Sequence, residues 1–211
     1  MIAAAVQLAD EDGLATPAMR KIATALGVEA MSLYNHVSNK DDILDGMVDL
    51  VFTELELPVP GESWQDATRR HAASLRAALT RHPWATGVLQ SRPAPGPGNR
   101  RHNDAVLGVF RRAGFPLVLT AHAVSVIDSY VYGFALQSTN MPIATPEEVA
   151  EVADGILRDL DAEQYPHLTE MIVDHALQPG YAYGDEFDYG LDLIINGLER
   201  ALTADRDPGG G

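Results

Sequence analysis

The side chains between residues 30 and 40 are of types that contact nucleic acid. A hydroxyl, a phenol, an amide and an imidazole lie within five residues, at Ser32, Tyr34, Asn35 and His36. Such groups hydrogen-bond to base edges and phosphate oxygens. Lys40 follows at the start of the next predicted helix, where its ammonium and the free helix amides would both attract phosphate. This segment therefore predicts a surface that binds DNA.

The helix predicted to precede this segment has one apolar face. It begins at Thr16-Pro17, a hydroxyl cap followed by proline at the first helical position, and it ends at Gly27. Its apolar residues are spaced i, i+3, i+4 and i+7, at Met19, Ile22, Ala23 and Leu26. That spacing predicts one buried face, which leaves Arg20 pointing elsewhere.

A second short helix, about residues 29–36, is predicted after the turn Leu26-Gly27-Val28, with Val28 and Leu33 buried. A helix over about residues 2–12 would come before the pair. Another would follow it, capped by Ser38 with Asp41 three residues later, and would end at the Pro- and Gly-rich segment 57–61. Two short helices joined by a tight glycine turn and packed on a third form a helix-turn-helix.

The charge of the chain argues against a nucleic-acid partner. The formal net charge is −15, and residues 1–57 carry ten acidic side chains against three basic ones, Arg20, Lys21 and Lys40. Phosphate contacts supply much of the affinity for DNA, so this composition lowers it. A DNA-binding protein tolerates it if its few cations face the phosphates. The alternative is a helical small-molecule-binding protein whose DNA binding is weak or lost.

Almost every later segment also predicts helix, so we expect an all-α fold. Strand-like alternation is lacking, and helices are expected over about 63–81, 84–90, 100–113, 117–138, 145–160, 165–177 and 185–203. The predicted domains are residues 1–57, with the helix-turn-helix and a linking fourth helix, and residues 62–203, a larger helical domain that binds a ligand and dimerises. Residues 204–211 are expected to be a disordered tail.

Residues 19–44, MRKIATALGVEAMSLYNHVSNKDDIL, resemble the N-terminal signature of the tetracycline-repressor (TetR) family. Fragments at 82–84, 114–115, 130–134 and 187–191 are similar to its C-terminal domain. The resemblance implies a dimeric, ligand-responsive transcriptional repressor that binds a pseudo-palindromic operator in double-stranded DNA. It also implies DNA contacts at Arg20, Ala30, Met31, Ser32, Tyr34, Asn35, His36 and Lys40.

Two predicted helices carry more apolar surface than one core requires. The helix at 117–138 is apolar nearly all round, and the last helix carries a broad apolar stripe. Two such helices from each of two chains would form a four-helix bundle with two-fold symmetry. The expected interface residues of this homodimer are Val124, Val131, Phe187, Leu191, Ile194, Ile195, Leu198 and Leu202. A wholly buried central helix in a monomer is the alternative.

A sensor pocket is expected between the helices of the second domain. The candidate lining residues are mainly apolar with a few polar groups: His71, Leu75, Trp84, Leu89, Asn103, Val106, Leu107, Phe110, His122, Val126, Tyr130, Phe134, Gln137, Met171 and His175. This mixture favours a bulky, mainly apolar effector held by a few hydrogen bonds. His122, Tyr130 and Gln137, roughly on one helix face, are the expected polar anchors.

The resemblance also bears on the effector. The founding members of the family place a histidine shortly before a Thr-Arg-Pro loop to recognise a magnesium–tetracycline complex. Here Ser91-Arg92-Pro93 aligns with that loop, and Val88 replaces the histidine. We therefore expect another natural product or drug-like molecule, with no cofactor and no metal.

Other classes of protein fit the sequence less well. The chain has no cysteine, no glycine-rich phosphate loop, no HExxH and no Ser-His-Asp context, so we expect no catalytic residues and no enzyme. No apolar run is read as a membrane span and no signal peptide is visible, so we expect a cytoplasmic protein.

Overall fold

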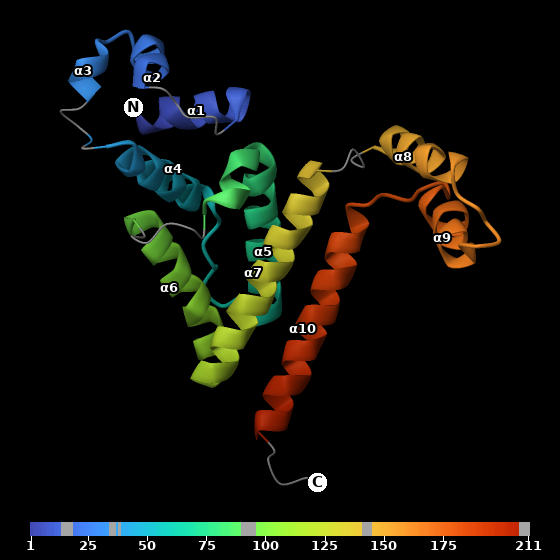
Figure 1. The fold of residues 1–211 in the computed structure, drawn as a ribbon. Helices are drawn as coiled ribbons and strands as arrows, with labels where there is room; N and C mark the ends of the chain where they lie inside the picture. Colours follow the sequence, from blue (N-terminus) through green and yellow to red (C-terminus); the bar gives the residue numbers. More distant parts are fainter. Residues whose placement is uncertain (14–18, 34–36, 38, 90–95, 141–144, 207–211) are drawn as a thin grey trace. The chain divides into compact units, whose positions relative to one another are not determined.

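The computed structural model describes residues 1–13, 19–33, 37, 39–89, 96–140 and 145–206 (Figure 1). Every regular element in these ranges is a helix, which confirms the predicted all-α fold. The elements are α1 (Ile2–Asp12), α2 (Met19–Leu26), α3 (Ala30–Leu33), α4 (Lys40–Glu54), α5 (Trp64–Arg81), the 3₁₀ helix η1 (Pro83–Gly87), α6 (Pro97–Arg112), α7 (Leu117–Asn140), α8 (Pro146–Arg158), α9 (Pro166–Met171), the π-helical η2 (Ile172–Ala176) and α10 (Asp185–Arg206).

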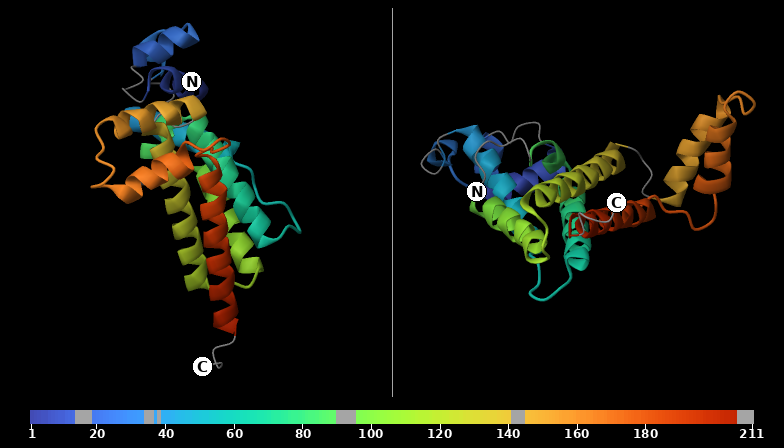
Figure 2. Two further views of the ribbon diagram at one scale, coloured as in Figure 1. Left: turned by 90° about the vertical axis from the view of Figure 1, so that its right-hand side faces the viewer. Right: turned by 90° about the horizontal axis from the view of Figure 1, so that it is seen from below.

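The chain forms two compact units, Met1–Ala135 and Leu136–Gly211. This division does not follow the predicted boundary at 57–61, because α4 packs against both α1 and α6 and so joins the helix-turn-helix to α5, α6 and most of α7. Figure 2 shows α1 to α4 from two further sides. A functional division at 57–61 stays a prediction.

The helix-turn-helix is built around a small apolar core. In α1, Ala5, Val6 and Ala9 are buried, and in α2, Ile22 and Ala23 are buried as their spacing predicts. Leu26, expected on the same buried face, is 38% exposed at the end of α2. Gly27 ends α2 with a φ of 65°, a conformation that glycine adopts without strain. The turn differs from the prediction at Val28, which is 45% exposed, because its side chain follows the glycine outside both helices.

The helix caps follow local chemistry. The Ser63 side chain accepts a hydrogen bond from the Asp66 amide, which fixes the start of α5 where the sequence predicts it. At α8, Thr145 and Glu148 form the reciprocal pair of bonds of a capping box. The prediction that Ser38 caps α4 is wrong. Asn39 is the cap and accepts from the Asp42 amide at 2.9 Å; both residue types cap well, so residue type alone does not choose between adjacent positions.

Some helix bounds differ from the prediction. The segment expected to be a helix over 84–90 is the shorter turn η1, and α6 begins three residues early, with Pro97 at its first position. The segment expected over 165–177 is α9 followed by the π-helical η2. α10 continues to Arg206, so residues 204–206 are helical instead of part of a disordered tail.

α7 is long and apolar enough to cross a membrane by length and composition, contrary to the sequence reading that found no such run. One such helix is weak evidence, because a core helix of a soluble protein passes the same test. α7 also carries His122 and Asp128 within its length, and Asp128 faces an ionisable partner, His71, on α5. Charged groups in mid-span are costly in lipid, so these residues favour a role inside the protein fold.

Candidate functional site

The predicted DNA-contact side chains that the structure describes lie on the surface of α2, α3 and α4. Met31 is 76% exposed, and Arg20 and Lys40 are also exposed. Ser32 is half-buried, and its hydroxyl donates to the Glu29 carbonyl at 2.7 Å. Leu33 is buried beneath α3 as predicted. Tyr34, Asn35, His36 and the side chain of Ala30 lie outside the described residues.

A cavity of about 340 Å³ lies between α4, α5, α6 and α7. Its lining combines aliphatic, aromatic and polar side chains: Phe52, Leu55, His71, Leu75, Leu89, Asn99, His102, Asn103, Asp128 and Tyr132. This volume is within the range of small-molecule sites. We call it the main cavity.

A second cavity, of about 290 Å³, lies where α4 meets the first turns of α6. Its lining residues are Asp49, Phe52, Thr53, Leu55, Leu57, Pro97, Gly98, Arg101 and His102. It shares Phe52, Leu55 and His102 with the main cavity. Phe52 of α4, Leu55 at the C-terminal cap of α4 and His102 of α6 therefore form a common wall between the two cavities.

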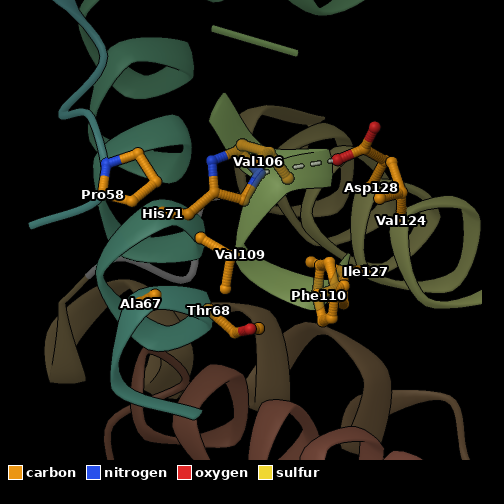
Figure 3. Close-up of a pocket in the computed structure, with 10 residues that line it drawn as sticks. All are labelled: Pro58, Ala67, Thr68, His71, Val106, Val109, Phe110, Val124, Ile127 and Asp128. Carbon is orange, nitrogen blue, oxygen red and sulfur yellow. Dashed lines mark ion pairs between the residues drawn. The ribbon is translucent and has the colours of Figure 1, made fainter. Parts of the chain in front are cut away.

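Two histidines and an aspartate form the polar end of the main cavity. Nε2 of His71 lies 3.7 Å from Oδ1 of Asp128, the ion pair drawn in Figure 3. The rings of His71 and His102 are 5.0 Å apart. Figure 3 draws a much smaller apolar pocket that the His71–Asp128 pair also lines, together with Val106, Phe110 and Ile127 among others.

His102 is buried without a hydrogen-bond partner. Its ring is 2% exposed, and neither ring nitrogen has a partner among the described residues. Burial and, to a smaller extent, the neighbouring His71 lower the pKa of His102 to about 4, while Asp128 partly opposes the shift. At neutral pH the ring is uncharged, with one donor and one acceptor unused. Such a group is costly, and it is often found where a ligand binds.

Six of the predicted pocket residues line these cavities: His71, Leu75, Leu89, Asn103, Val106 and Phe110. Others do not. Leu107, His122 and Val126 are exposed, while Tyr130 and Phe134 line none of the described cavities. Trp84 is buried but donates to Asp10 instead.

Three predicted pocket residues belong to the second unit, which is described by itself. There, Gln137 accepts a hydrogen bond from the Tyr183 hydroxyl at 2.7 Å. Met171 is 54% exposed, and Nε2 of His175 lies 3.2 Å from Glu186. A role of these three side chains in ligand binding stays a prediction.

The sequence reading missed six residues that line the main cavity: Phe52, Leu55, Asn99, His102, Asp128 and Tyr132. On α7 it chose the face of His122, Val126 and Tyr130, whereas the cavity is lined by Asp128 and Tyr132. Two residues along a helix correspond to a rotation of about 200°, so the two faces are nearly opposite. The one signal for the face that lines the cavity was the charge of Asp128, because the helix is apolar nearly all round.

Carboxylates of α1 and α4 contact donors beside η1, and we call this the junction cluster. Asp10 Oδ1 lies 2.8 Å from His82 Nδ1 and accepts a hydrogen bond from Trp84 Nε1 at 2.7 Å. Glu54 Oε2 lies 3.1 Å from His82 Nε2 and accepts from Arg81 at 2.9 Å. Burial raises the pKa of Glu54, but the hydrogen bonds of Arg81 and His82 outweigh it and hold that pKa below its usual range.

α4 and α6 meet at a second close contact. The Asp49 carboxylate of α4 accepts a hydrogen bond from the Asn99 backbone amide, in the first turn of α6, at 2.9 Å. A Cβ atom at Gly98 would lie 2.8 Å from the Asp49 carbonyl oxygen, and one at Gly96 would lie 2.3 Å from the Asp49 side chain. The helices approach this closely because both positions are glycine. Asp10, Asp49 and Glu54 thus bind partners within the protein, which accounts for part of the acidic excess in residues 1–57.

The residues of α10 that are predicted to form the dimer interface are not the apolar residues that this helix leaves exposed. Val131 of α7 and Phe187, Leu191, Ile195, Leu198 and Leu202 of α10 are buried in the chain, while Val124 and Ile194 are half-buried. The large apolar side chains that α10 leaves exposed are Tyr189 and Leu193. A buried side chain cannot also be offered to a partner, so the predicted stripe does not describe a free surface. An interface between two copies at these positions stays a prediction.

A helix-turn-helix followed by an all-helical region with a ligand-sized cavity defines a class of protein, the DNA-binding regulators that respond to small molecules. Residues 1–47 match "Bacterial regulatory proteins, tetR family", and residues 57–202 match "Tetracyclin repressor-like, C-terminal domain". The chain therefore belongs to the TetR family of transcriptional regulators, which confirms the resemblance found in the sequence.

Relatives and solved structures agree with this family. The chain is 34% identical over 215 residues to the HTH-type transcriptional repressor DrrR1 of Streptomyces coeruleorubidus, covering 98% of this chain and 78% of that protein. It is 41% identical over 134 residues to an HTH-type transcriptional regulator of Saccharopolyspora erythraea, covering 63% of this chain and 57% of that protein. The crystal structure of ActR from Streptomyces coelicolor, in complex with (S)-DNPA, matches with a TM-score of 0.77, 26% identity and 95% coverage of both chains.

Proposed function

We propose that this protein is a transcriptional repressor that binds operator DNA as a homodimer and releases it when a small molecule fills the main cavity. The observation that carries the proposal is the shared wall of the two cavities. Phe52 lies on α4, the helix that follows the helix-turn-helix, and Leu55 is the C-terminal cap of α4, while His102 belongs to α6. A ligand against this wall contacts both helices at once.

The switch requires a difference in affinity. A ligand shifts an equilibrium only if it binds one arrangement of the protein more tightly than the other. A molecule that moves the His102 ring would move α6 against α4, because the ring lies 5.8 Å from Phe52. α4 also carries Lys40, so its displacement would change how the recognition residues of the two protomers fit one operator.

The DNA-contact residues are the predicted set, from Arg20 to Lys40. The exposure of Arg20, Met31 and Lys40 supports this assignment. Tyr34, Asn35 and His36 carry the polar groups for base edges. In a symmetric dimer the two copies would contact two half-sites of a pseudo-palindrome. The protein would act in the cytoplasm, without catalytic activity.

The effector is a small molecule with a substantial apolar surface. ActR, a structural neighbour at 27% identity, has been crystallised with actinorhodin, which supports a natural product or drug-like molecule for this family branch. Val88 stands where the founding family members have a metal-binding histidine, so a magnesium–tetracycline complex is not the proposed effector. Leu75, Leu89 and Phe52 supply the apolar contacts in the main cavity.

The second candidate is a helical small-molecule-binding protein with weak or lost DNA binding, which the net charge of −15 favours. Selection from sheared genomic DNA of the source bacterium, in 50 mM salt, separates the two. The repressor predicts enrichment of a pseudo-palindrome whose half-sites are one helical turn apart, or a multiple of it. The absence of any enriched sequence at this salt concentration would reject the repressor and leave the second candidate.

A further inference from the structure

Asp128 places a carboxylate in a cavity that contains no lysine or arginine among its described lining residues. It lines both the main cavity and the small apolar pocket (Figure 3). Its side chain is 25% exposed, so it is largely removed from bulk water. A carboxylate in such surroundings interacts strongly with any charge that enters the same space.

The only ion-pair partner of Asp128 within the described part of the chain is His71, and the contact is loose. The two atoms are 3.7 Å apart, beyond the length of a charge-assisted hydrogen bond. His102, the other histidine of the cavity, is uncharged at neutral pH because burial lowers its pKa to about 4. The carboxylate therefore retains acceptor positions that no donor among the described residues fills.

Arg70 and Arg76, each next in sequence to a cavity residue of α5, contact other groups, and Arg70 binds Glu62 and the Leu57 carbonyl. The guanidinium of Arg76, next to Leu75, lies over the Phe134 ring at 4.8 Å from its centroid. Arg101 lines the second cavity, beyond the shared wall at His102. An anionic ligand in the main cavity would thus meet a carboxylate with no lysine or arginine among the described lining residues, and the net charge of −15 adds to this repulsion.

We infer that the effector of this protein carries a basic amine, which is protonated at neutral pH and pairs with Asp128 while its apolar ring system fills the main cavity. This inference rests on the proposed function, because it assigns the chemical class of the ligand to the same cavity. The ammonium donates to Asp128, and the ring system lies against Leu75, Leu89 and Phe52. His102 gains its first hydrogen-bond partner from a hydroxyl or carbonyl of the ligand.

Three fluorescent probes with one aromatic body and different charges test the inference. Dansylcadaverine carries a primary ammonium, its N-acetyl derivative is neutral, and dansyl-6-aminohexanoic acid is an anion of similar length. Binding to the full chain without DNA is measured at pH 7.0 by dansyl fluorescence. We expect the ammonium probe to bind at least 10-fold more tightly than the neutral probe, and the anion to bind most weakly.

Variants separate the charge of Asp128 from its shape. Asp128→Asn keeps the size of the side chain and should abolish the preference for the ammonium probe, while Asp128→Glu should restore most of it. Asp104→Asn is the matched control, because Asp104 is an exposed acid on α6 that lines none of the described cavities. It should keep the wild-type preference. Thermal unfolding of each variant shows whether it is folded.

The outcomes are distinct. Equal affinities of the three probes for the wild type, or an unchanged preference in Asp128→Asn, overturn the assignment of an amine ligand but leave the repressor intact. If none of the probes binds, the main cavity is not the site of an aromatic amine and the inference also fails. Failure of the repressor itself is read from the DNA selection, which contains no probe.

Discussion

The Asp10 carboxylate of α1 lies 2.8 Å from Nδ1 of His82, a residue 72 positions later that is only 6% exposed. The other ring nitrogen of His82 faces Glu54 of α4. Carboxylates only accept hydrogen bonds, so a protonated His82 can donate to both, whereas a neutral ring can donate to only one of them. This residue therefore connects two helices of the DNA-binding region with the end of α5.

The junction cluster should contribute measurably to stability. Asp10→Asn removes the charge that faces His82 and Trp84, in a site where the donors are largely buried. We expect the free energy of unfolding to fall by about 1–3 kcal/mol, the usual cost of disturbing a buried charge-assisted hydrogen bond. Urea unfolding monitored by circular dichroism measures it.

Asp12→Asn is the matched control for this prediction. Asp12 forms an ion pair with Lys21 at 2.6 Å, but both side chains are more than half exposed. Exposed ion pairs contribute little to stability, so the free energy of unfolding measured in urea should hardly change. Equal effects of the two substitutions would show that the junction cluster is no more important than a surface pair.

The contact between α4 and α6 depends on glycine at position 98. Gly98→Ala places a Cβ 2.8 Å from the Asp49 carbonyl oxygen and from the Thr53 methyl carbon, so the helices must separate. We expect a loss of about 1–3 kcal/mol in the free energy of unfolding, typical of overpacking. Gly155→Ala, in α8, has open space around its Cβ and should be neutral or stabilising. A tolerated Gly98→Ala would contradict the described approach of the two helices.

His102 should make stability depend on pH in acid. Its pKa is about 4 in the folded protein and about 6.5 when unfolded, so the unfolded chain binds the additional proton more readily. The free energy of unfolding should therefore fall as the pH decreases from about 6.5 to about 4, by up to ~3 kcal/mol, and then level off. His102→Leu should lose this part of the pH dependence in urea unfolding at a series of pH values. If the free energies of unfolding of the wild type and of His102→Leu change with pH in the same way, His102 is not the cause of the pH dependence.

The cations of the helix-turn-helix should differ in their effect on DNA affinity. Arg20 and Lys40 are proposed to contact phosphate, and a substitution changes both protomers of the homodimer. Each substitution by alanine should therefore remove two phosphate contacts and reduce the slope of log affinity against log salt concentration by about 2. Lys21→Ala is the control, since the Lys21 ammonium lies 2.6 Å from Asp12. Its slope should stay near the wild-type value. Fluorescence anisotropy with the selected duplex gives these slopes, and identical changes for all three lysine and arginine variants would count against the assignment.

Local chemistry made much of the fold predictable. Ser63 and the Thr145–Glu148 pair mark helix starts through bonds that span three residues, and Gly27 marks the turn through its positive φ. The cavity residues His71 and Leu75 were also predictable, because they lie one turn apart on the buried face of an amphipathic helix.

Contacts between residues distant in sequence were not predictable. No spacing rule connects Asp10 with His82. The face of α7 that lines the cavity could not be chosen from the sequence, because α7 carries apolar residues on nearly all of its faces. Asp128 was therefore missed while His122 was selected. The apolar stripe of α10 was recognised, but the pattern does not tell whether such a stripe is covered by the same chain or by a second copy.

The affinity of Tyr34→Ala for the selected operator duplex, measured by gel shift beside its affinity for dansylcadaverine, tests the central claim most directly. Tyr34 belongs to the proposed recognition helix, and the proposed effector site is formed by residues of α4 to α7. The account predicts that operator binding is lost while binding of the fluorescent probe is unchanged. An operator affinity equal to that of the wild type would contradict it.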